Sequence, residues 1–197
     1  MGRNLMKHFA AILSLACALV PAPASAQEGK KWRPYQFVGN ERYEYKIAIL
    51  DGDEKKESGY ILDLRKKGDD QFEVTSSTRN LMKKEQGPEI ILGGGMMGLS
   101  PMLFLMNPLL GAFIEQIELK EGEKMSLFGA GVVKVTKKET VAGRTGFTCE
   151  MYTKVEDKDV LTWVVTIDPE LALPIKSITY EGGKEKHRAD LISYKKD

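Results

Sequence analysis

The chain has 197 residues, and its 29 Lys and Arg residues nearly balance its 28 Asp and Glu residues, which gives a net charge of +1 at pH 7. A chain with so little excess charge gives no indication of nucleic acid or of an anionic membrane surface as its partner. Hydrophobic residues make up 42% of the chain, and the length is that of one domain.

The first 26 residues have the three parts of a secretory signal peptide. Arg3 and Lys7 form a basic n-region, residues 9–20 form an apolar h-region, and Ala24-Ser25-Ala26 is a small-residue cleavage site. The h-region is too short to span a membrane as a helix. We therefore expect export across the inner membrane and a mature periplasmic chain that begins at Gln27.

Cleavage after Ala26 would leave 171 residues and, with two basic and no acidic residues removed, a net charge of −1. It would also remove Cys17, so that Cys149 is the only Cys of the mature chain and an internal disulfide is impossible. The alternative is a lipid-modified N-terminus at Cys17. Ser14 argues against it, because bacterial lipoproteins usually carry Leu at that position.

Alternating apolar and polar residues predict strands on both sides of a central apolar segment. The first three are predicted at residues 43–50, 60–65 and 72–76, joined by turns at 51–53 and 68–70. Later strands are predicted at 124–138, with a break near Gly129-Ala130-Gly131, and at 145–156, 159–168, 173–181 and 186–195. Connections this short imply antiparallel neighbours.

These elements predict a mainly β (α+β) fold, a single curved antiparallel sheet of about eight strands that forms an unclosed half-barrel. One face of such a sheet is apolar and must be covered. We expect a signal peptide at 1–26, an N-terminal lead-in at 27–40 and one β domain at 41–197, with an apolar helical insert at 90–117 as its lid.

The insert includes residues 90–114, a run of 25 positions without a charge. Ser100-Pro101 and Asn107-Pro108 each combine an N-cap residue with Pro at the first helical position, which predicts two short helices at about 101–106 and 108–117. A transmembrane helix is the rival interpretation. Pro108 would fall inside that span, and the signal peptide would place Lys83 and Lys84 outside, against the positive-inside rule.

The insert has two interpretations, a lid over an apolar ligand or simply a part of the core. Met clusters there, and unbranched thioether side chains repack easily around apolar shapes. The residues that we expect to contact such a ligand are Met96, Met97, Leu99, Met102, Leu103, Met106, Leu110, Phe113 and Trp163.

The order of parts resembles the LolA/LolB-like group of bacterial outer-membrane lipoprotein-sorting proteins. The resemblance lies in the signal peptide and in four phrases, Glu121-Gly122-Glu123-Lys124, Val141-Ala142-Gly143-Arg144 before Cys149-Glu150-Met151-Tyr152, Trp163 to Ile167, and Leu173-Pro174-Ile175-Lys176 before Gly182-Gly183. It implies an unclosed β-barrel wrapped over an apolar helical lid, and a role in carrying lipoprotein acyl chains or another lipid.

The sequence contains no motif for a catalytic residue, a metal site or a cofactor, and we do not expect an enzyme. His187, the only His after residue 26, is predicted in an exposed strand. Alternation along 147–155 places Phe147, Cys149, Met151 and Val155 on the core face and Thr148 on the other. The predicted function is a monomeric envelope protein that binds an apolar or lipidic ligand. The alternative is an envelope interaction module whose apolar segment docks a protein partner.

Overall fold

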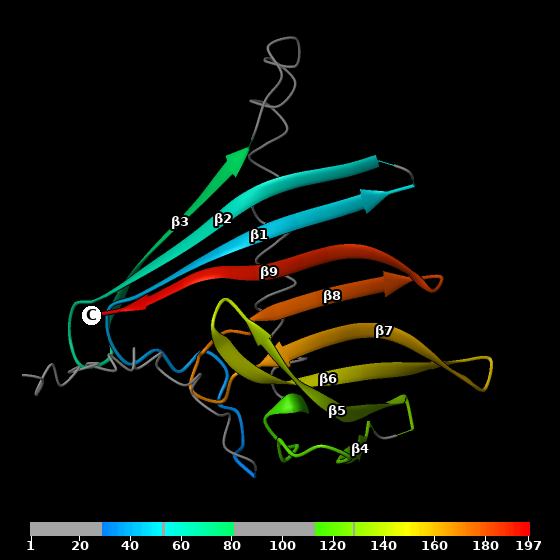
Figure 1. Cartoon of the computed structure of the whole chain (residues 1–197). Coiled ribbons are helices and arrows are strands. Elements are labelled where there is room, and N and C mark those ends of the chain that lie inside the picture. The colour runs from blue at the N-terminus through cyan, green and yellow to red at the C-terminus, as the bar shows by residue number, and fades with distance from the viewer. Residues whose placement is uncertain (1–28, 53, 81–112, 128) are drawn as a thin grey trace, which may run out of the picture.

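A computed structural model of the chain describes residues 29–52, 54–80, 113–127 and 129–197. These residues form one antiparallel sheet of nine strands, in the order β3-β2-β1-β9-β8-β7-β6-β5-β4, and Figure 1 shows it strongly twisted. The strands are β1 (Glu41–Asp51), β2 (Glu54–Lys66), β3 (Phe72–Asn80), β4 (Lys124–Ser126), β5 (Gly131–Val141), β6 (Arg144–Val155), β7 (Lys158–Ile167), β8 (Lys176–Glu181) and β9 (Lys184–Lys196). Within the described residues β3 and β4 are the two edges, so the sheet is not closed.

The prediction of a mainly β fold with one open antiparallel sheet is confirmed. The break predicted near Gly129-Ala130-Gly131 within 124–138 is confirmed, because the chain reverses there and β4 pairs with β5. Gly129 has a positive φ of 83°, which favours glycine. A Cβ at Gly131 would collide with the carbonyl oxygen of Tyr152 on β6, so this position also requires glycine.

Three of the hairpins close with turns of only two residues. Ala142-Gly143, Glu156-Asp157 and Gly182-Gly183 each have positive φ at both positions, and each lies between paired strand ends. This is the conformation of type I′ turns, whose twist matches that of the flanking strands.

Four β-bulges change which face of the sheet the following side chains occupy. The register shifts leave one extra residue each, Thr136 on β5, Thr162 on β7, and Lys186 and Ile192 on β9. An extra residue reverses the alternation beyond it. Ile192, the extra residue of its bulge, is 56% exposed.

One face of the sheet, which we call the inner face, is covered by three segments, residues 29–38, 113–119 and 171–175. Residues 29–38 belong to the stretch predicted as a lead-in. They contribute Trp32, which is only 1% exposed and whose indole N–H donates a 2.7 Å hydrogen bond to the carbonyl oxygen of Leu171. Backbone hydrogen bonds also join Gly29 and Lys30 to Leu119. The lead-in is thus part of the core.

The predicted helical lid falls mostly outside the described residues. The helix at 101–106 lies entirely outside them, and of the helix at 108–117 only residues 113–117 are described. These form one helical turn, with i to i+3 hydrogen bonds from Gln116 to Phe113 and from Ile117 to Ile114. The described ranges therefore contain no helix that could serve as the lid, nor one that is long and apolar enough to cross a membrane.

Trp32 gives a test of the N-terminal segment. Trp32→Ala should lower the free energy of unfolding by about 3–5 kcal/mol, because it removes a buried indole and leaves a cavity. Trp32→Phe keeps most of the packing but leaves the Leu171 carbonyl without its donor, which should cost about 1–3 kcal/mol. Urea unfolding followed by circular dichroism measures both. A loss below about 0.5 kcal/mol for Trp32→Ala would show that residues 29–38 are not part of the folded domain.

Candidate functional site

Two clusters of buried side chains occupy the inner face. The indole cluster consists of Trp32, Ile114, Ile117, Leu119, Leu127, Val133, Val135, Phe147, Cys149, Trp163, Val165 and Ile167. The tyrosine cluster consists of Tyr43, Tyr45, Ile47, Tyr60, Leu62, Leu64, Leu171, Leu173, Ile175, Ala189 and Leu191. Strand β8 lies between them, because Ser177 pairs with Val165 on one side and with Ala189 on the other.

Trp163 lies in the indole cluster, on the strand next to β8. Its position on β7 pairs with Met151 on β6 and with Thr179 on β8. Its indole N–H donates a 2.8 Å hydrogen bond to the Ser177 hydroxyl, which is itself buried. This bond satisfies the one polar group of the side chain, so the indole is buried in the cluster at no polar cost.

A row of polar side chains crosses the inner face beside Trp163. Thr179 pairs with His187 in the sheet, and the Thr179 hydroxyl and His187 Nδ1 share a 3.0 Å hydrogen bond. His187 is half-buried, and burial followed by the charge of Lys186 lowers its pKa. The prediction of an exposed His187 was wrong, because β9 places it on the same face as the buried Ala189 and Leu191.

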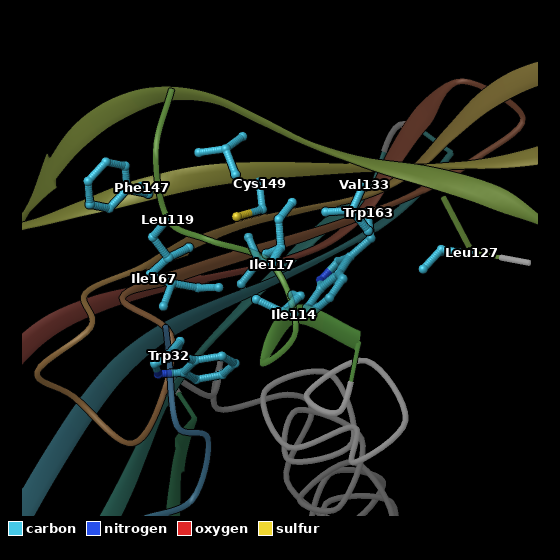
Figure 2. Close-up of a cluster of buried hydrophobic side chains, with 12 residues drawn as sticks. Trp32, Ile114, Ile117, Leu119, Leu127, Val133, Phe147, Cys149, Trp163 and Ile167 are labelled. Atoms are coloured by element: carbon cyan, nitrogen blue, oxygen red, sulfur yellow. The ribbon is translucent and has the colours of Figure 1, made fainter. Parts of the chain in front are cut away.

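Three partly buried side chains form the rim of the indole cluster. Phe113, Met125 and Met151 pack against it without being fully covered. Met125 and Met151 both pair with Val133, so the two thioethers come from β4 and β6 on either side of β5. Figure 2 shows the buried cluster itself, with side chains of β5, β6 and β7 facing those of residues 113–119. The rim is apolar and adaptable.

Only two of the nine predicted ligand-contacting residues belong to the described part of the chain. Met96, Met97, Leu99, Met102, Leu103, Met106 and Leu110 lie outside the described residues. Phe113 and Trp163 are described, and both belong to the indole cluster or its rim. The sequence interpretation missed Trp32, Met125 and Ser177 at this site. Trp32 precedes the first predicted strand, so periodicity gave no signal for it.

The far end of the tyrosine cluster carries a buried carboxylate. Glu41 accepts hydrogen bonds from the Tyr43 hydroxyl at 2.6 Å and from the Val38 amide at 2.7 Å. Burial, followed by this carboxylate, raises the pKa of Tyr43 well above its ordinary value. A cavity of about 350 Å³ opens beside it, lined by Asn40, Glu41, Arg42, Asp63, Leu64, Arg65, Lys195 and Asp197. Its charged lining does not suit an apolar ligand.

The opposite face of the sheet, the outer face, holds a polar network around Glu139. The carboxylate accepts a 2.6 Å hydrogen bond from the Lys176 ammonium and bonds of 3.3 and 3.2 Å from the buried hydroxyls of Thr148 and Thr166. Desolvation opposes the charged carboxylate, but Lys176 and the Thr166 hydroxyl together lower the pKa of Glu139 below its ordinary 4.5. The bulge at Thr136 brings Glu139 to this face.

The Glu139 network predicts a pH-dependent effect of Lys176→Met. Because the folded-state pKa of Glu139 is lowered, its contribution to stability is present above the ordinary value of 4.5 and is lost as pH falls through the folded value. We expect a loss of about 1–3 kcal/mol at about pH 7 and a much smaller loss at about pH 3, measured by urea unfolding.

Lys55→Met is the matched control for this variant. Lys55 forms an ion pair of similar length, 2.7 Å, with Glu57, but both side chains are well exposed, so its loss should be below about 1 kcal/mol. An equal loss for Lys176→Met at both pH values would show that the side chain acts through packing and not through its charge.

Cys149 lies on the inner face, as predicted, and is 1% exposed. Phe147 is buried beside it, but Val155, predicted on the same face, is 52% exposed because it lies at the hairpin turn beyond the covered part of the sheet. Thr148, predicted on the other face, is buried there under Glu139. Burial raises the pKa of the Cys149 thiol to about 12.

A buried thiol with so high a pKa should not react in the native protein. At neutral pH a thiol reagent should label Cys149 only after denaturant has unfolded the chain, because the reactive thiolate is scarce and covered. Mass spectrometry of samples quenched before and after unfolding measures the labelled fraction. Rapid labelling of the folded protein would contradict the position of β6 in the sheet.

Neither a protein-family model nor a curated protein matches the chain. A solved structure to which it is similar is the 2.22 Å crystal structure of a Bacteroides fragilis NCTC 9343 protein, provisionally described as exported, with a YmcC-like fold. The two chains are 10% identical, and the alignment covers 84% of this chain and 99% of the other with a TM-score of 0.37. None of these comparisons shows the LolA/LolB-like family.

Proposed function

We propose that this protein binds an apolar or amphiphilic ligand with an acyl chain against the inner face of its sheet, at the rim of the indole cluster. The observation that carries the proposal is the rim itself. Phe113, Met125 and Met151 are apolar but only partly buried, and they pack against the cluster that contains the buried indole of Trp163. Each methylene that an acyl chain buries there contributes about 0.8 kcal/mol.

The shape of the sheet supports the same proposal. An open antiparallel sheet exposes one apolar face that a ligand can share with the protein's own covering segments. Unbranched Met side chains adapt to chains of different length and branching. No residue of the rim carries a charge that a bound acyl chain would have to desolvate.

The cellular setting of the proposal comes from the sequence. The signal peptide at residues 1–26 predicts export, and the resemblance to the LolA/LolB-like group suggests lipid or lipoprotein acyl chains as the ligand in the periplasm. Lipoprotein sorting is the most specific form of the proposal. An interaction module that docks a protein partner remains the alternative function.

The two tryptophans of the chain allow a direct binding test, since both lie in the indole cluster. In a Trp32→Phe background Trp163 is the only fluorophore of its kind. A fatty acid brominated along its chain should quench this fluorescence at saturable, micromolar concentrations, because bromine quenches indole on contact. The unbrominated fatty acid should compete and relieve the quenching.

Substitutions at Met151 distinguish the rim from an unspecific apolar surface. Met151→Asp places a charge where the acyl chain would lie and should weaken binding by about ten-fold or more. Met151→Leu conserves the volume and should change affinity by less than about three-fold. Circular dichroism checks that both variants fold. Absence of saturable quenching in Trp32→Phe would refute the proposal.

Mass spectrometry of organic extracts separates the two candidate functions. A lipid that recurs in extracts of independently purified protein favours the carrier. If the purified protein contains no lipid and one envelope protein reproducibly co-purifies with it, the interaction module is favoured.

A further inference from the structure

In the part of the chain that the structure describes, strand β3 is a sheet edge with little of the usual protection against pairing. Among the described residues it pairs with β2 alone, through nine consecutive residue pairs with no bulge. Seven of its nine residues are exposed, and Phe72 and Thr78 are half-buried. Its centre, residues 74–78, contains no charge and no Pro. In natural edge strands, charged residues and Pro usually block pairing with another chain. The other edge of the sheet, β4, has only three residues.

We propose that β3 pairs antiparallel with β3 of a second copy of this chain, about a two-fold axis at Ser76. Ser76 is the midpoint of the strand, so this register uses all nine residues. A two-fold axis perpendicular to the sheet keeps the inner faces of both copies on the same side. Two residues that lie directly opposite each other across the paired β3 strands must then both belong to the inner face or both to the outer face. Only registers centred on a residue satisfy this condition.

Charge complementarity selects the register centred on Ser76. It places Glu73 of one copy opposite Arg79 of the other, and the symmetry makes this pair twice. Both residues lie on the outer face, since Glu73 pairs with Arg65 and Arg79 with Gly59 on β2. A register centred on Thr75 would place Glu73 opposite Ser77, and one centred on Ser77 would place it beyond the end of the partner strand. Neither register places a cation of β3 opposite Glu73.

Arg79 is the cation that the second copy would bring to Glu73. Gly59, its neighbour across the strands, has no side chain, and Arg79 makes no ion pair with the described residues. Glu73 already has a 2.9 Å ion pair with Lys67, and a carboxylate can accept a second cation. Opposite charges directly across an antiparallel pair stabilise it, and like charges destabilise it.

The uncharged centre of β3 also fits a copy of itself. Val74 is 54% exposed and would lie opposite Thr78 of the second copy, while Thr75 would lie opposite Ser77. Facing β-branched pairs and facing hydroxyl pairs are favourable across strands. The paired sheets would form one continuous sheet with both inner faces on the same side. This inference does not depend on the proposed ligand, and it replaces the expectation of a monomer.

Cysteine cross-linking tests the register. In this register Ser76→Cys places two thiols directly opposite each other at the axis. In Ser77→Cys each thiol lies opposite Thr75 of the other copy, so the two thiols do not face each other. Under mild oxidation of the mature protein, Ser76→Cys should form a disulfide-linked dimer at least about ten-fold faster than Ser77→Cys. Cys149 is buried and gives little background. Equal rates for the two variants, or no cross-link from either, would overturn the proposal.

Charge reversal tests the pairing without a covalent link. Wild-type protein should show a concentration-dependent dimer in sedimentation velocity, and Glu73→Arg should weaken it by about ten-fold because like charges then meet twice. Adding Arg79→Glu to this variant should restore the dimer. Glu54→Arg, on β2 away from this edge, is the control and should leave the dimer unchanged. A monomer at all concentrations, or no rescue by the double reversal, would overturn the proposal.

Discussion

The hydrogen bond from the Trp32 indole to the Leu171 carbonyl joins the two halves of this molecule. Trp32 belongs to the indole cluster and Leu171 to the tyrosine cluster, so the bond connects the cores on either side of β8. It also joins two of the covering segments, residues 29–38 and 171–175, over the inner face. A sheet with one apolar face has no stable core until something covers that face. Here residues far apart in sequence supply the cover together.

The strands were predictable from the sequence because alternation is a local signal. The three two-residue turns were predictable as well, since Gly and acidic residues mark them. The bulges were not predictable, because an extra residue such as Thr136 carries no mark in one sequence. Beyond that bulge Glu139 faces outward and meets Lys176, and no reading by alternation alone would place it there. A bulge therefore limits how far alternation alone can assign side chains to a face.

The candidate site was predictable only where hydrophobicity singles out a residue. Trp163 and Phe113 were named from the sequence, and both lie at the indole cluster. Met125 was not named, because its strand has three residues and is too short to show a period. Ser177 was not named either, because its role depends on the register between β7 and β8, which brings it to the Trp163 indole. Contacts that depend on strand pairing cannot be predicted until the pairing is known.

The polar residues on the inner face limit which ligands the proposed site suits. Ser177, Thr179 and His187 lie in neighbouring strands beside Trp163, and their hydrogen bonds are made within the sheet. Ser177 is already buried, but Thr179 and His187 are half-buried. A hydrocarbon laid over these two residues would desolvate them at a cost, whereas a hydroxyl or carboxyl group could share their hydrogen bonds. An acyl chain on the Met125 and Met151 rim with its polar end toward His187 would match both surfaces. An amphiphile therefore fits the inner face better than a plain hydrocarbon does.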